Sequence, residues 1–409
     1  IHDMPKSILT VHPDPETHRA ALFDLMGKSF GNYWGSLEYC RNGYIDGSHY
    51  NWRTSRIGLL DNEIVPHFGV WDYQMRVGND AIRTGGIGAV MTDRRFRKRG
   101  YMKETAEASC QAMESEGYGL SVLFGIPGFY QKFGYVSGWD NSVITVNERD
   151  LLPPPAKLKM KRAEYPEERS LESISNRTDS GLTGTAVRPT YAKNRHRDNW
   201  LCFRWQSLSS AGDGYVIIEY EDHACKLIDC GGRGIDVLSA CTQLLRRRGC
   251  VELKIPDLHR NHPLFDALRQ VPYKREEYNN PEGGAMIKVT NFPVCLRSIQ
   301  KTLMRRLRES SFCDWTGSLH FQKDREPVVM VIDRRGITIQ EGAQAKSWAS
   351  KERIHKVRFG DEIGQILVGL DNPLRLIERN GMRTTGDAKG LMAALFPEQF
   401  PCLGKWDQF

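Results

Sequence analysis

The sequence lacks a long apolar run. Its 409 residues contain no segment approaching the roughly 18 consecutive apolar positions that a membrane-spanning helix needs. The first residues, IHDMPKSILTV, also lack the basic segment and apolar core of a secretory signal peptide. We therefore expect a cytoplasmic protein with no membrane partner.

Closely spaced cysteine pairs are also missing. The ten cysteines are scattered, and no two have the CxxC spacing of a zinc ribbon. His259 and His262 have HxxH spacing, but two histidines on a loop are more often capping or surface groups than metal ligands. A chain of this length does not depend on disulfides, so we expect reduced thiols, mostly in the core, and no metal site.

Charge of one sign is only in mild excess. The chain has 57 Lys and Arg against 50 Asp and Glu, a net charge of +7, and it is 40% hydrophobic and 26% charged. This is an ordinary globular composition, and the length predicts roughly two to four domains. The excess permits an anionic partner without requiring one. A dedicated nucleic-acid binder is usually more basic, so we expect no nucleic-acid partner.

Two common phosphate-binding motifs are absent. The P-loop pattern GxxxxGK[ST] does not occur, and GGIGAV is not the GxGxxG of dinucleotide-binding folds. A phosphate site in this chain must therefore be of another type.

What the sequence does contain is a dense basic segment, DRRFRKRGYMKE, at residues 93–104. Six cations fall within the eleven positions from Arg94 to Glu104, with Gly100 among them. The segment precedes a predicted helix, whose N-terminus disfavours cations unless an anion binds, and whose first amides need acceptors. A glycine there allows close backbone approach. We favour a phosphate site, with a solvated charged face and a nucleic-acid patch as the alternatives.

The hydrophobic pattern of the first part predicts mixed strands and helices. Residues 63–92 read as antiparallel strands with a turn at VGND, and an apolar stripe of helical spacing from Met102 to Met113 predicts a helix ending near Gly117. The other expected elements are strands at 7–12 and 120–124, a helix within 15–30, and a short helix with a return strand within 127–136.

The second part repeats this order in a degenerate form. The proline run Pro153–Pro155 marks a boundary, because it continues neither a helix nor a strand. Beyond it, Gly234 and Gly249 enclose a helix, followed by a hydrophobic strand and a short helix. This copy keeps a GGRG loop but lacks the long cationic run. Its other expected strands lie at 214–220, 224–230 and 284–291.

The third part, from about residue 294, reads as a small α+β domain. The segment LRSIQKTLMRRLRES, residues 296–310, is expected to form one basic amphipathic helix that docks on the other domains or, alternatively, meets a membrane surface or partner. Strands are expected at 317–322, 327–340 and 363–370, before helices and a coil ending in FPCLGKWDQF.

Two motifs resemble a known family. Residues 97–102, RKRGYM, resemble the R-x-x-G-x-(G/A) pyrophosphate loop of the GCN5-related N-acetyltransferases (GNAT), with Met102 where Gly or Ala is usual. GFYQKFGYV, at residues 128–136, resembles the family's fYekfGF ending. The three-part layout and the terminal phenylalanine resemble the enhanced-intracellular-survival (Eis-type) acetyltransferases, and this resemblance covers nearly the whole chain.

The resemblance implies a fold class and a division into domains. The fold would be α/β (α+β), with tandem GNAT folds and a sterol-carrier-protein-like α+β domain. An active GNAT domain that binds acetyl-CoA would occupy 1–141 and a degenerate one 142–293. Residues 294–409 would form the third domain, with a catalytic C-terminus. The family also implies a homo-oligomer, with a hexamer as the candidate.

The resemblance also implies contacts with acetyl-CoA. Backbone groups at the end of the second hairpin strand would meet the pantetheine arm, amides of the basic segment would wrap the pyrophosphate, and residues after strand 120–124 would border the cofactor where the strands splay. The implied contact residues are Val90, Met91, Thr92, Arg97, Lys98, Arg99, Gly100, Tyr101, Met102, Lys103, Gly125 and Ile126.

Two catalytic residues are implied in the same way. Tyr130 matches the family's general acid, and a phenol with a pKa near 10 suits a thiolate leaving group. The carboxylate of Phe409 matches its general base, a weak base that acts best through a water or after burial. The alternatives are an aromatic packing residue for Tyr130 and a frayed terminus for Phe409. The apolar end, with Trp406, favours docking.

The implied activity is N-acetylation by direct attack of a primary amine on the thioester. The acceptors would be aminoglycosides, polyamines or lysine side chains. Such cationic acceptors need an acidic pocket, for which we find no concentrated stretch beyond scattered candidates such as Glu398 and Asp407. The aromatic segments FGNYWGSLEY and YNWR either line an amine pocket or belong to the core. A non-catalytic CoA- or lipid-sensing module is the alternative function.

Overall fold

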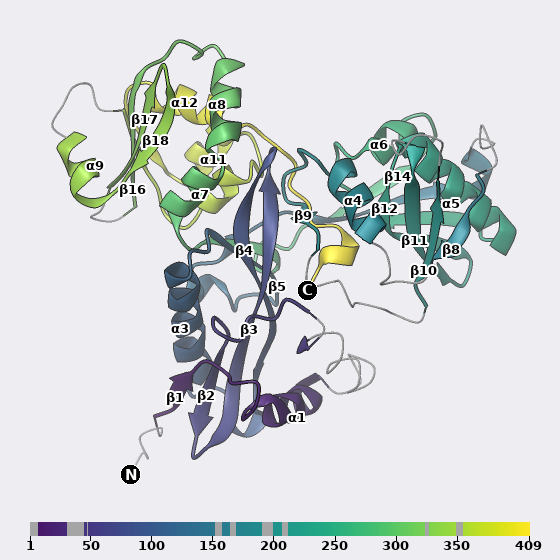
Figure 1. Ribbon diagram of the computed structural model, residues 1–409, viewed down its shortest axis with the longest axis horizontal. Helices are drawn as coiled ribbons and strands as arrows, with labels where there is room; N and C mark the ends of the chain where they lie inside the picture. Colours follow the sequence, from purple (N-terminus) through teal and green to yellow (C-terminus); the bar gives the residue numbers. More distant parts are fainter. Residues whose placement is uncertain are drawn as a thin grey trace.

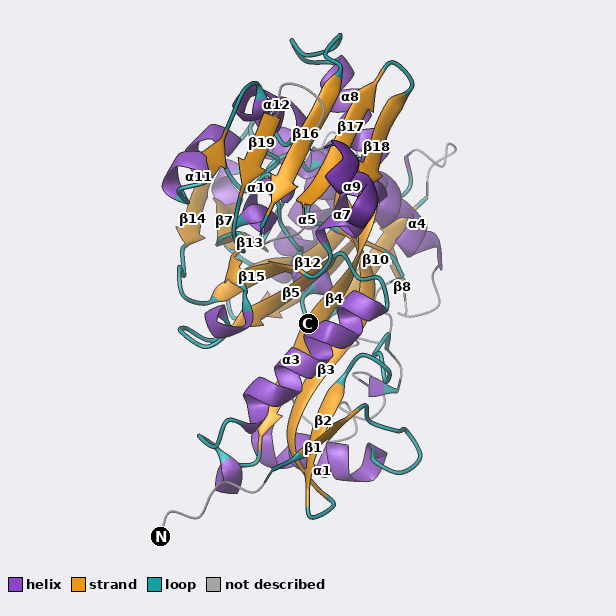
Figure 2. Ribbon diagram, turned by 90° about the vertical axis from the view of Figure 1, so that its left-hand side faces the viewer, coloured by secondary structure: helices purple, strands orange, loops and turns teal. Residues whose placement is uncertain are grey.

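The computed structural model describes residues 7–30, 45–46, 48–151, 158–163, 169–189, 199–206, 212–323, 327–348 and 355–409. This part of the chain forms three β-sheets, each with helices packed on it (Figure 1, Figure 2). The expectation of a mixed α/β chain is confirmed. None of the described helices is long and apolar enough to cross a membrane.

The first sheet contains the predicted hairpin. β3 (Glu63–Val77) and β4 (Asp80–Thr92) are antiparallel, and β4 is followed by α3 (Tyr101–Ser115) and the parallel strand β5 (Leu120–Gly125). The strand order is β1-β2-β3-β4-β5-β15-β6, with β9 beside β3. The remaining strands are β1 (Leu9–Val11), β2 (Arg56–Leu60), β6 (Val136–Ser137), β9 (Ala186–Val187) and β15 (Gly284–Val289).

Two helices cover opposite faces of this sheet. Val70 of β3 packs in one core cluster with Met113 of α3, while its neighbour Trp71 packs in another with Leu22 of α1 (Arg19–Phe30). Successive strand residues point to opposite faces, so α3 and α1 lie on different sides. The sheet is therefore buried on both sides at its centre, as the long apolar run of β3 requires.

The second sheet has seven strands in the order β14-β7-β13-β12-β11-β10-β8. Its β12 (Ala224–Gly231), α5 (Gly234–Arg248) and β13 (Glu252–Pro256) follow one another, and the two strands pair in parallel. The order strand, helix, parallel strand thus occurs in both sheets. The other elements are β7 (Asn141–Asn147), β8 (Lys161–Ala163), β10 (Leu201–Trp205), β11 (Gly214–Glu221), β14 (Lys274–Tyr278), α4 (Arg169–Thr178) and α6 (Pro263–Leu268).

The third sheet has five strands in the order β18-β17-β16-β19-β20. The predicted strands at 317–322 and 327–340 are confirmed as β16 and as the hairpin β17–β18. Its elements are β16 (Gly317–Gln322), β17 (Pro327–Asp333), β18 (Gly336–Gln340), β19 (His355–Arg358), β20 (Arg383–Thr384), α7 (Phe292–Ser298), α8 (Gln300–Arg308), α9 (Gly342–Trp348), α10 (Ile363–Leu367), α11 (Pro373–Arg379) and α12 (Ala388–Leu395).

The sheets are not built from three separate stretches of sequence. β15 comes from late in the chain, yet it pairs with both β5 and β6 of the first sheet. β9 likewise follows α4, which belongs with the second sheet, and yet it pairs with β3 of the first sheet. We call each sheet with its helices a unit. The C-terminus lies near the centre of the molecule, among the three sheets (Figure 1). This interleaving ties the units together and brings the end of the chain to the first sheet.

Two expectations for the third part are wrong. The segment expected as a strand at 363–370 contains helix α10, because a short run buried on all sides does not reveal its period. The helix expected over 296–310 is broken at Ile299, whose φ of −111° lies outside the helical region, so α7 and α8 are separate. The expected docking is confirmed, since the backbone N–H of Thr302 donates to Asp80 Oδ2 at 2.7 Å.

Candidate active site

The first sheet opens between β4 and β5. Their parallel ladder ends at the pair Ile87 and Leu123, although β4 continues to Thr92 and β5 to Gly125. Just beyond the last pair, Ala89 has a φ of 45°, which interrupts the regular strand. The carboxyl ends of the two strands therefore separate, and this is the place where open α/β sheets bind ligands.

A buried histidine holds the irregular residue of β4. His67 Nδ1 lies 2.8 Å from the carbonyl oxygen of Ala89, and its Nε2 lies 2.8 Å from the hydroxyl of Tyr50. A carbonyl only accepts, so Nδ1 carries the proton and Nε2 accepts from Tyr50. Burial lowers the pKa of His67 to about 4, which keeps the ring neutral. The contact fixes the shape of β4 at the opening.

The basic segment leads from β4 to α3 with an open backbone. Lys98 has a φ of 64° and Gly100 a φ of 87°, and α3 begins after Gly100 without a side-chain cap. A Cβ added to Gly100 would meet no atom within 4 Å. The described residues thus leave free space beside Gly100 at the start of α3, and the helix dipole favours an anion there.

A cavity of about 490 Å³ lies at this opening. It joins the end of β4, the basic segment and the residues that follow β5, three regions that the sequence analysis proposed to meet at one cofactor. Of the implied contact residues all except Gly125 line it. The lining residues are Ser29, Phe30, Val90, Met91, Thr92, Phe96, Arg97, Lys98, Arg99, Gly100, Tyr101, Met102, Lys103, Ile126, Phe129, Tyr130 and Lys132.

The cations of the basic segment differ in what they contact. Arg95 forms ion pairs with Asp93 and Glu63, and it does not line the cavity. Within the described residues, no carboxylate lies at ion-pair distance from Arg97, Lys98 or Arg99, which all line it. Three cations thus gather beside an uncapped helix start, an arrangement that attracts phosphate.

Tyr130 lines this cavity and is largely buried. It precedes the short helical turn η4 (Gln131–Phe133), and its ring packs edge-on against Phe129 and Tyr135. A Cβ added to Gly125 would lie 2.6 Å from the Tyr130 ring, so only glycine permits this approach. Burial raises the pKa of Tyr130 to about 12, so the phenol stays protonated at neutral pH and is available as a donor.

Phe409, the last residue, reaches the same opening from the other side. Its ring lies 5.7 Å from that of Tyr73 on β3 and 5.6 Å from that of Phe124 on β5. It also covers Gly86 of β4, where an added Cβ would lie 2.7 Å from the ring. The chain end is therefore packed between strands and not frayed, although Phe409 does not line the cavity itself.

Tyr130 and Phe409 approach the end of β5 from its two faces. Tyr130 packs on Gly125, whereas Phe409 packs on the preceding Phe124. Neighbouring strand residues point to opposite faces, so the two side chains flank the opening between β4 and β5. A molecule held in that opening would lie between them.

Several lining residues were not anticipated from the sequence. Ser29 and Phe30 end α1, far from the motifs in sequence, and no local signal points to them. Phe129 and Lys132 are within the FYQKF segment, and the ammonium of Lys132 lies 4.0 Å from the Phe129 ring centre. Helical spacing placed Met102 on the apolar side of α3, and its side chain is buried there in a core cluster.

The structure places some of the residues that the sequence analysis considered for the amine acceptor. Tyr50 belongs to the core, where it packs on Trp71 and binds His67. Most of the segment FGNYWGSLEY lies outside the described residues. Asp407 is buried in an ion pair with Arg188, so its charge is neutralised within the protein.

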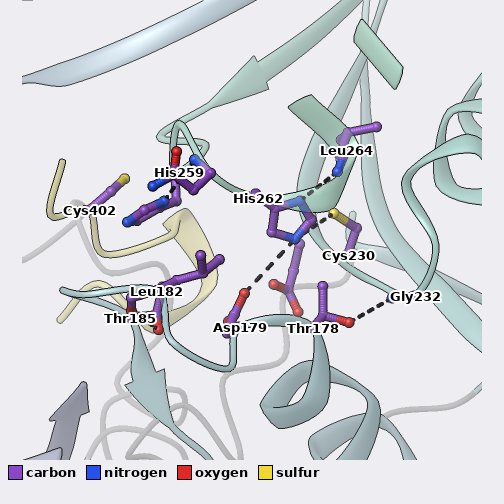
Figure 3. Close-up of polar contacts among 12 residues, drawn as sticks. Thr178, Asp179, Leu182, Thr185, Cys230, Gly232, His259, His262, Leu264 and Cys402 are labelled. Carbon is purple, nitrogen blue, oxygen red and sulfur yellow. Dashed lines mark hydrogen bonds and ion pairs between the residues drawn. The ribbon is translucent and has the colours of Figure 1, made fainter. Parts of the chain in front are cut away.

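The two histidines at 259 and 262 were expected to be capping or surface groups, and both are buried, which leaves the capping alternative. His262 Nδ1 accepts from the backbone N–H of Leu264 and caps α6, as predicted for a capping group. Its Nε2 lies 3.9 Å from Asp179 Oδ1 and 4.0 Å from Cys230 Sγ (Figure 3). Among the described residues, no group of three or more His, Cys, Asp or Glu side chains is placed to hold a metal.

A family model for the acetyltransferase (GNAT) domain matches residues 37–137. The match includes the hairpin, the basic segment, α3, β5 and Tyr130. No curated protein matches the chain in sequence.

Solved structures resemble nearly the whole chain. A GCN5-related N-acetyltransferase from Anabaena variabilis has a TM-score of 0.75 at 14% identity, covering 98% of this chain and 100% of its own. One from Kribbella flavida has a TM-score of 0.73 at 13% identity, covering 98% of each chain. Eis1 from Mycobacterium abscessus has a TM-score of 0.67 at 12% identity, covering 96% of this chain and 98% of its own. At such identities the likeness establishes a shared fold.

Proposed function

We propose that this chain, which carries a GNAT acetyltransferase domain, transfers the acetyl group of acetyl-CoA to a primary amine. GNAT acetyltransferases use acetyl-CoA, so the family match supports the acyl donor. The observation that carries the proposal is the cavity between β4, α3 and the turn after β5, where Arg97, Lys98 and Arg99 meet Tyr130.

The residues present fit coenzyme A. The uncapped start of α3 and the open backbone at Gly100 suit the pyrophosphate, with charge from Arg97, Lys98 and Arg99. Backbone groups of Val90, Met91 and Thr92, beyond the last pair that β4 forms with β5, would receive the pantetheine arm. Gly125 and Ile126 would border the thioester at the opening.

The proposed reaction takes place at the opening between β4 and β5, with Tyr130 and the terminal carboxylate of Phe409 as the two groups that transfer protons. An amine nitrogen attacks the thioester carbonyl carbon, forming the C–N bond, and the C–S bond then breaks. Tyr130 gives its phenolic proton to the departing thiolate and regains one from solvent. The terminal carboxylate of Phe409 accepts the proton released from the amine. No covalent enzyme intermediate is needed, because both substrates meet at the opening.

The domain assignment is also part of the proposal. Residues 1–141 would be the acetyl-CoA-binding GNAT domain, 142–293 a degenerate GNAT-like domain, and 294–409 a sterol-carrier-protein-like domain with the catalytic end. The order β12, α5, β13 supports the second assignment, and the fold likeness to Eis1 supports an Eis-type protein. We further propose a cytoplasmic homo-oligomer whose acceptor is an aminoglycoside, a polyamine or a lysine side chain.

The alternative function is a CoA- or lipid-sensing module without turnover. Loss of CoA binding after substitution of Arg97 and Arg99 is expected for both functions, so it does not distinguish them. Turnover does. The protonated Tyr130 and the packed Phe409 on either side of the opening favour the enzyme.

The test is a thiol-release assay with acetyl-CoA and a panel of amines. It compares the full chain with a version that has one extra glycine after Phe409, which moves the terminal carboxylate by a residue while keeping every side chain. We expect turnover to collapse in the extended protein while the affinity for CoA is unchanged. Equal turnover in both would remove the carboxylate of Phe409 from the mechanism, and an absence of turnover with every amine would count against the enzyme.

A further inference from the structure

The second sheet also opens between two parallel strands, and the chain's own end fills this opening. The ladder between β12 and β13 ends at Lys226 and Lys254, although β12 continues to Gly231 and β13 to Pro256. The space beyond is lined by both strands and by the C-terminal segment, residues 402–407, which leaves a cavity of only about 50 Å³.

The C-terminal segment is seated there by apolar contacts. Trp406 is buried in a core cluster of the second unit, where its ring lies 5.3 Å from that of Trp200. Gly184 lies so close to the segment that an added Cβ would collide with the backbone nitrogen of Cys402. Asp407 and Gln408 are also buried, so the chain is buried from Trp406 until one residue before its end.

One arginine joins this segment to the second sheet. Arg188 donates to Asp407 Oδ2 through Nη2 at 2.9 Å and Nε at 3.3 Å. It also donates to both oxygens of Asp229 on β12, at 2.7 and 2.9 Å, and to the hydroxyl of Tyr215 at 2.7 Å. Tyr215 donates in turn to Asp229 at 2.6 Å. The planar guanidinium thus satisfies two carboxylates at once, which an ammonium cannot reproduce.

A second contact acts one residue nearer to the end. Gln408 Nε2 donates to Asp257 Oδ2 at 2.6 Å, and Asp257 Oδ1 accepts from the backbone N–H of Ser142. Two carboxylates therefore hold the segment. Asp229 lies in β12 and acts through Arg188, whereas Asp257 directly follows β13 and binds Gln408 itself. Phe409 packs against the first sheet, and the two residues that precede it are held by these contacts, so its position depends on them.

We propose that Arg188 is a positioning residue for the acetyl transfer. By holding Asp407 on Asp229, it sets how far the chain end reaches into the opening between β4 and β5, and so where the carboxylate of Phe409 stands. The second unit then serves the reaction without touching the substrates. This inference rests on the proposed function, because it gives the terminal carboxylate a role in proton transfer.

The burial of the ion pairs explains why the contact is sensitive. Arg188 is 8% exposed and Asp407 is 5% exposed. Removing the guanidinium leaves two carboxylates close together and out of water, an arrangement far costlier than the intact cluster. Asp229 is fixed in a strand, whereas Asp407 is near a chain end. The segment around Asp407 is therefore the part expected to move.

The kinetic test places Arg188→Met and Arg188→Lys in two backgrounds, the natural end and the end extended by one glycine. With the natural end we expect Arg188→Met to lower kcat about 100-fold, the loss typical of a reacting group displaced by about 1 Å. The KM for acetyl-CoA should stay unchanged, and Arg188→Lys should recover part of kcat. With the extended end, where the carboxylate is already displaced, Arg188→Met should cause no further loss.

Arg76→Met is the matched control. Arg76 is 6% exposed and also buried between the sheets, but the hydrogen bonds of its guanidinium go to Asn176, Thr185 and Ala186, outside the C-terminal segment. Any loss it causes should be equal in both backgrounds. If Arg188→Met behaves in the same way, with equal losses in both, the residue is structural and the proposal is overturned.

A second measurement does not depend on activity. Carboxypeptidase A removes an accessible terminal aromatic residue, and mass spectrometry follows the loss of Phe409 from the folded chain. We expect slow removal in the wild type, fast removal in Arg188→Met, and an intermediate rate in Arg188→Lys. Equal rates of Phe409 removal in wild type and Arg188→Met would overturn the proposal that Arg188 positions the chain end. Failure of the proposed function would be seen separately, as no thiol release from the wild type with any amine.

Discussion

The two strand–helix–strand units of this chain share an order of elements but differ in what their openings contain. In each, a parallel ladder ends before its strands do, and a helix of 15 residues connects those strands. The opening between β4 and β5 borders a cavity of about 490 Å³ lined by cations. The opening between β12 and β13 holds the chain's own C-terminal segment. The same backbone order therefore leaves an open cavity lined by cations in one unit and a seat for the chain in the other.

The helix starts show how the difference arises. An added Cβ on Gly100 meets no atom within 4 Å, whereas one on Gly234 would collide with the backbone carbonyl of Pro263. In the second unit the first residues of α6 are packed directly on the start of α5. Arg233, which precedes α5, also pairs with Asp236 at 3.5 Å. Among the described residues at the start of α5, neither an open backbone nor a cation without an ion pair is left for an anion.

The short helices after the openings differ as well. The first unit has Tyr130 beside η4, with its hydroxyl-bearing ring at the cavity. In α6 of the second unit, PLFDAL, the aromatic residue is Phe265, which is buried in the core of that unit. A phenylalanine has no proton to donate. The comparison indicates that the order of strands and helices does not by itself produce such a cavity. The helix start must also be left unpacked by neighbouring segments.

The largest expected effect comes from removing the Trp406 side chain, which anchors the C-terminal segment at the opening between β12 and β13. Trp406→Ala removes a fully packed ring from the core of the second unit, and we expect the free energy of unfolding to fall by about 3–5 kcal/mol. Turnover should fall with it, because the segment leading to Phe409 loses its seat. Urea unfolding and thiol release measure the two effects, and Trp406→Phe, which keeps most of the ring area, is the control. A stable, fully active Trp406→Ala protein would contradict a role for this seat.

The sequence reveals the first opening better than the second. The basic segment, Gly100 and Tyr130 are close in sequence and carry a family motif, so local patterns place them on one helix start and one turn. Arg188 and Asp407 are 219 positions apart, and nothing local to either predicts their contact. Buried ion pairs of this kind depend on how whole units dock, which hydrophobic periodicity does not encode.

The same reasoning explains the local errors. Helix α10 was expected as a strand because a run of five residues buried on all sides has no readable period. The hairpin β3–β4 was predicted correctly because the turn residues Gly78 and Asn79 mark its end. Boundaries with turn chemistry are visible in a sequence, whereas the type of a fully buried short element is decided by its tertiary neighbours.

The second prediction concerns Tyr130, which has Phe265 as its counterpart in the short helix of the second unit. Tyr130→Phe should lower kcat about 100-fold, the usual contribution of a general acid, with little change in the KM for acetyl-CoA. Burial raises the pKa of Tyr130 to about 12, so in the wild type the acid form is kept as pH rises until that pKa is approached. We therefore expect no alkaline loss of kcat from this group at pH values well below 12.

Tyr135→Phe is the matched control for that substitution. Tyr135 is a buried tyrosine of the same unit, and its hydroxyl lies 2.7 Å from that of Ser121 instead of lining the cavity. It should cost stability and leave kcat near the wild-type value. If the two substitutions lower kcat equally, Tyr130 acts as a packing residue, and the two units differ less than proposed.

The third prediction compares alanine substitutions at the two glycines of the helix starts, Gly234 and Gly100. Gly234→Ala forces a methyl group against the carbonyl of Pro263 and should lower the free energy of unfolding by about 1–3 kcal/mol while leaving CoA affinity unchanged. Gly100→Ala has free space, so its stability cost is the backbone strain at a φ of 87°, about 1–2 kcal/mol. It should also weaken CoA binding, because in the proposed site the methyl group would stand where the pyrophosphate would approach. Urea unfolding and calorimetric titration with CoA check both, and the same pattern from both glycines would erase the contrast.

The smallest expected effects come from the arginines that precede the two helices. Substituting Arg97 and Arg99 together by alanine should weaken CoA binding about tenfold, which is on the order of 1.4 kcal/mol. Exposed charges are screened by salt, so this difference from the wild type should shrink as the salt concentration rises. Arg233→Ala, at the equivalent place before α5, should change neither CoA binding nor stability by more than about 0.5 kcal/mol, because its pair with Asp236 is largely exposed on the arginine side. A titration of each protein with CoA at low and high salt decides the matter. A loss of CoA affinity in Arg233→Ala that equals the loss in the double variant would mean that the second helix start also binds the anion, and that its closure by Pro263 does not exclude a ligand.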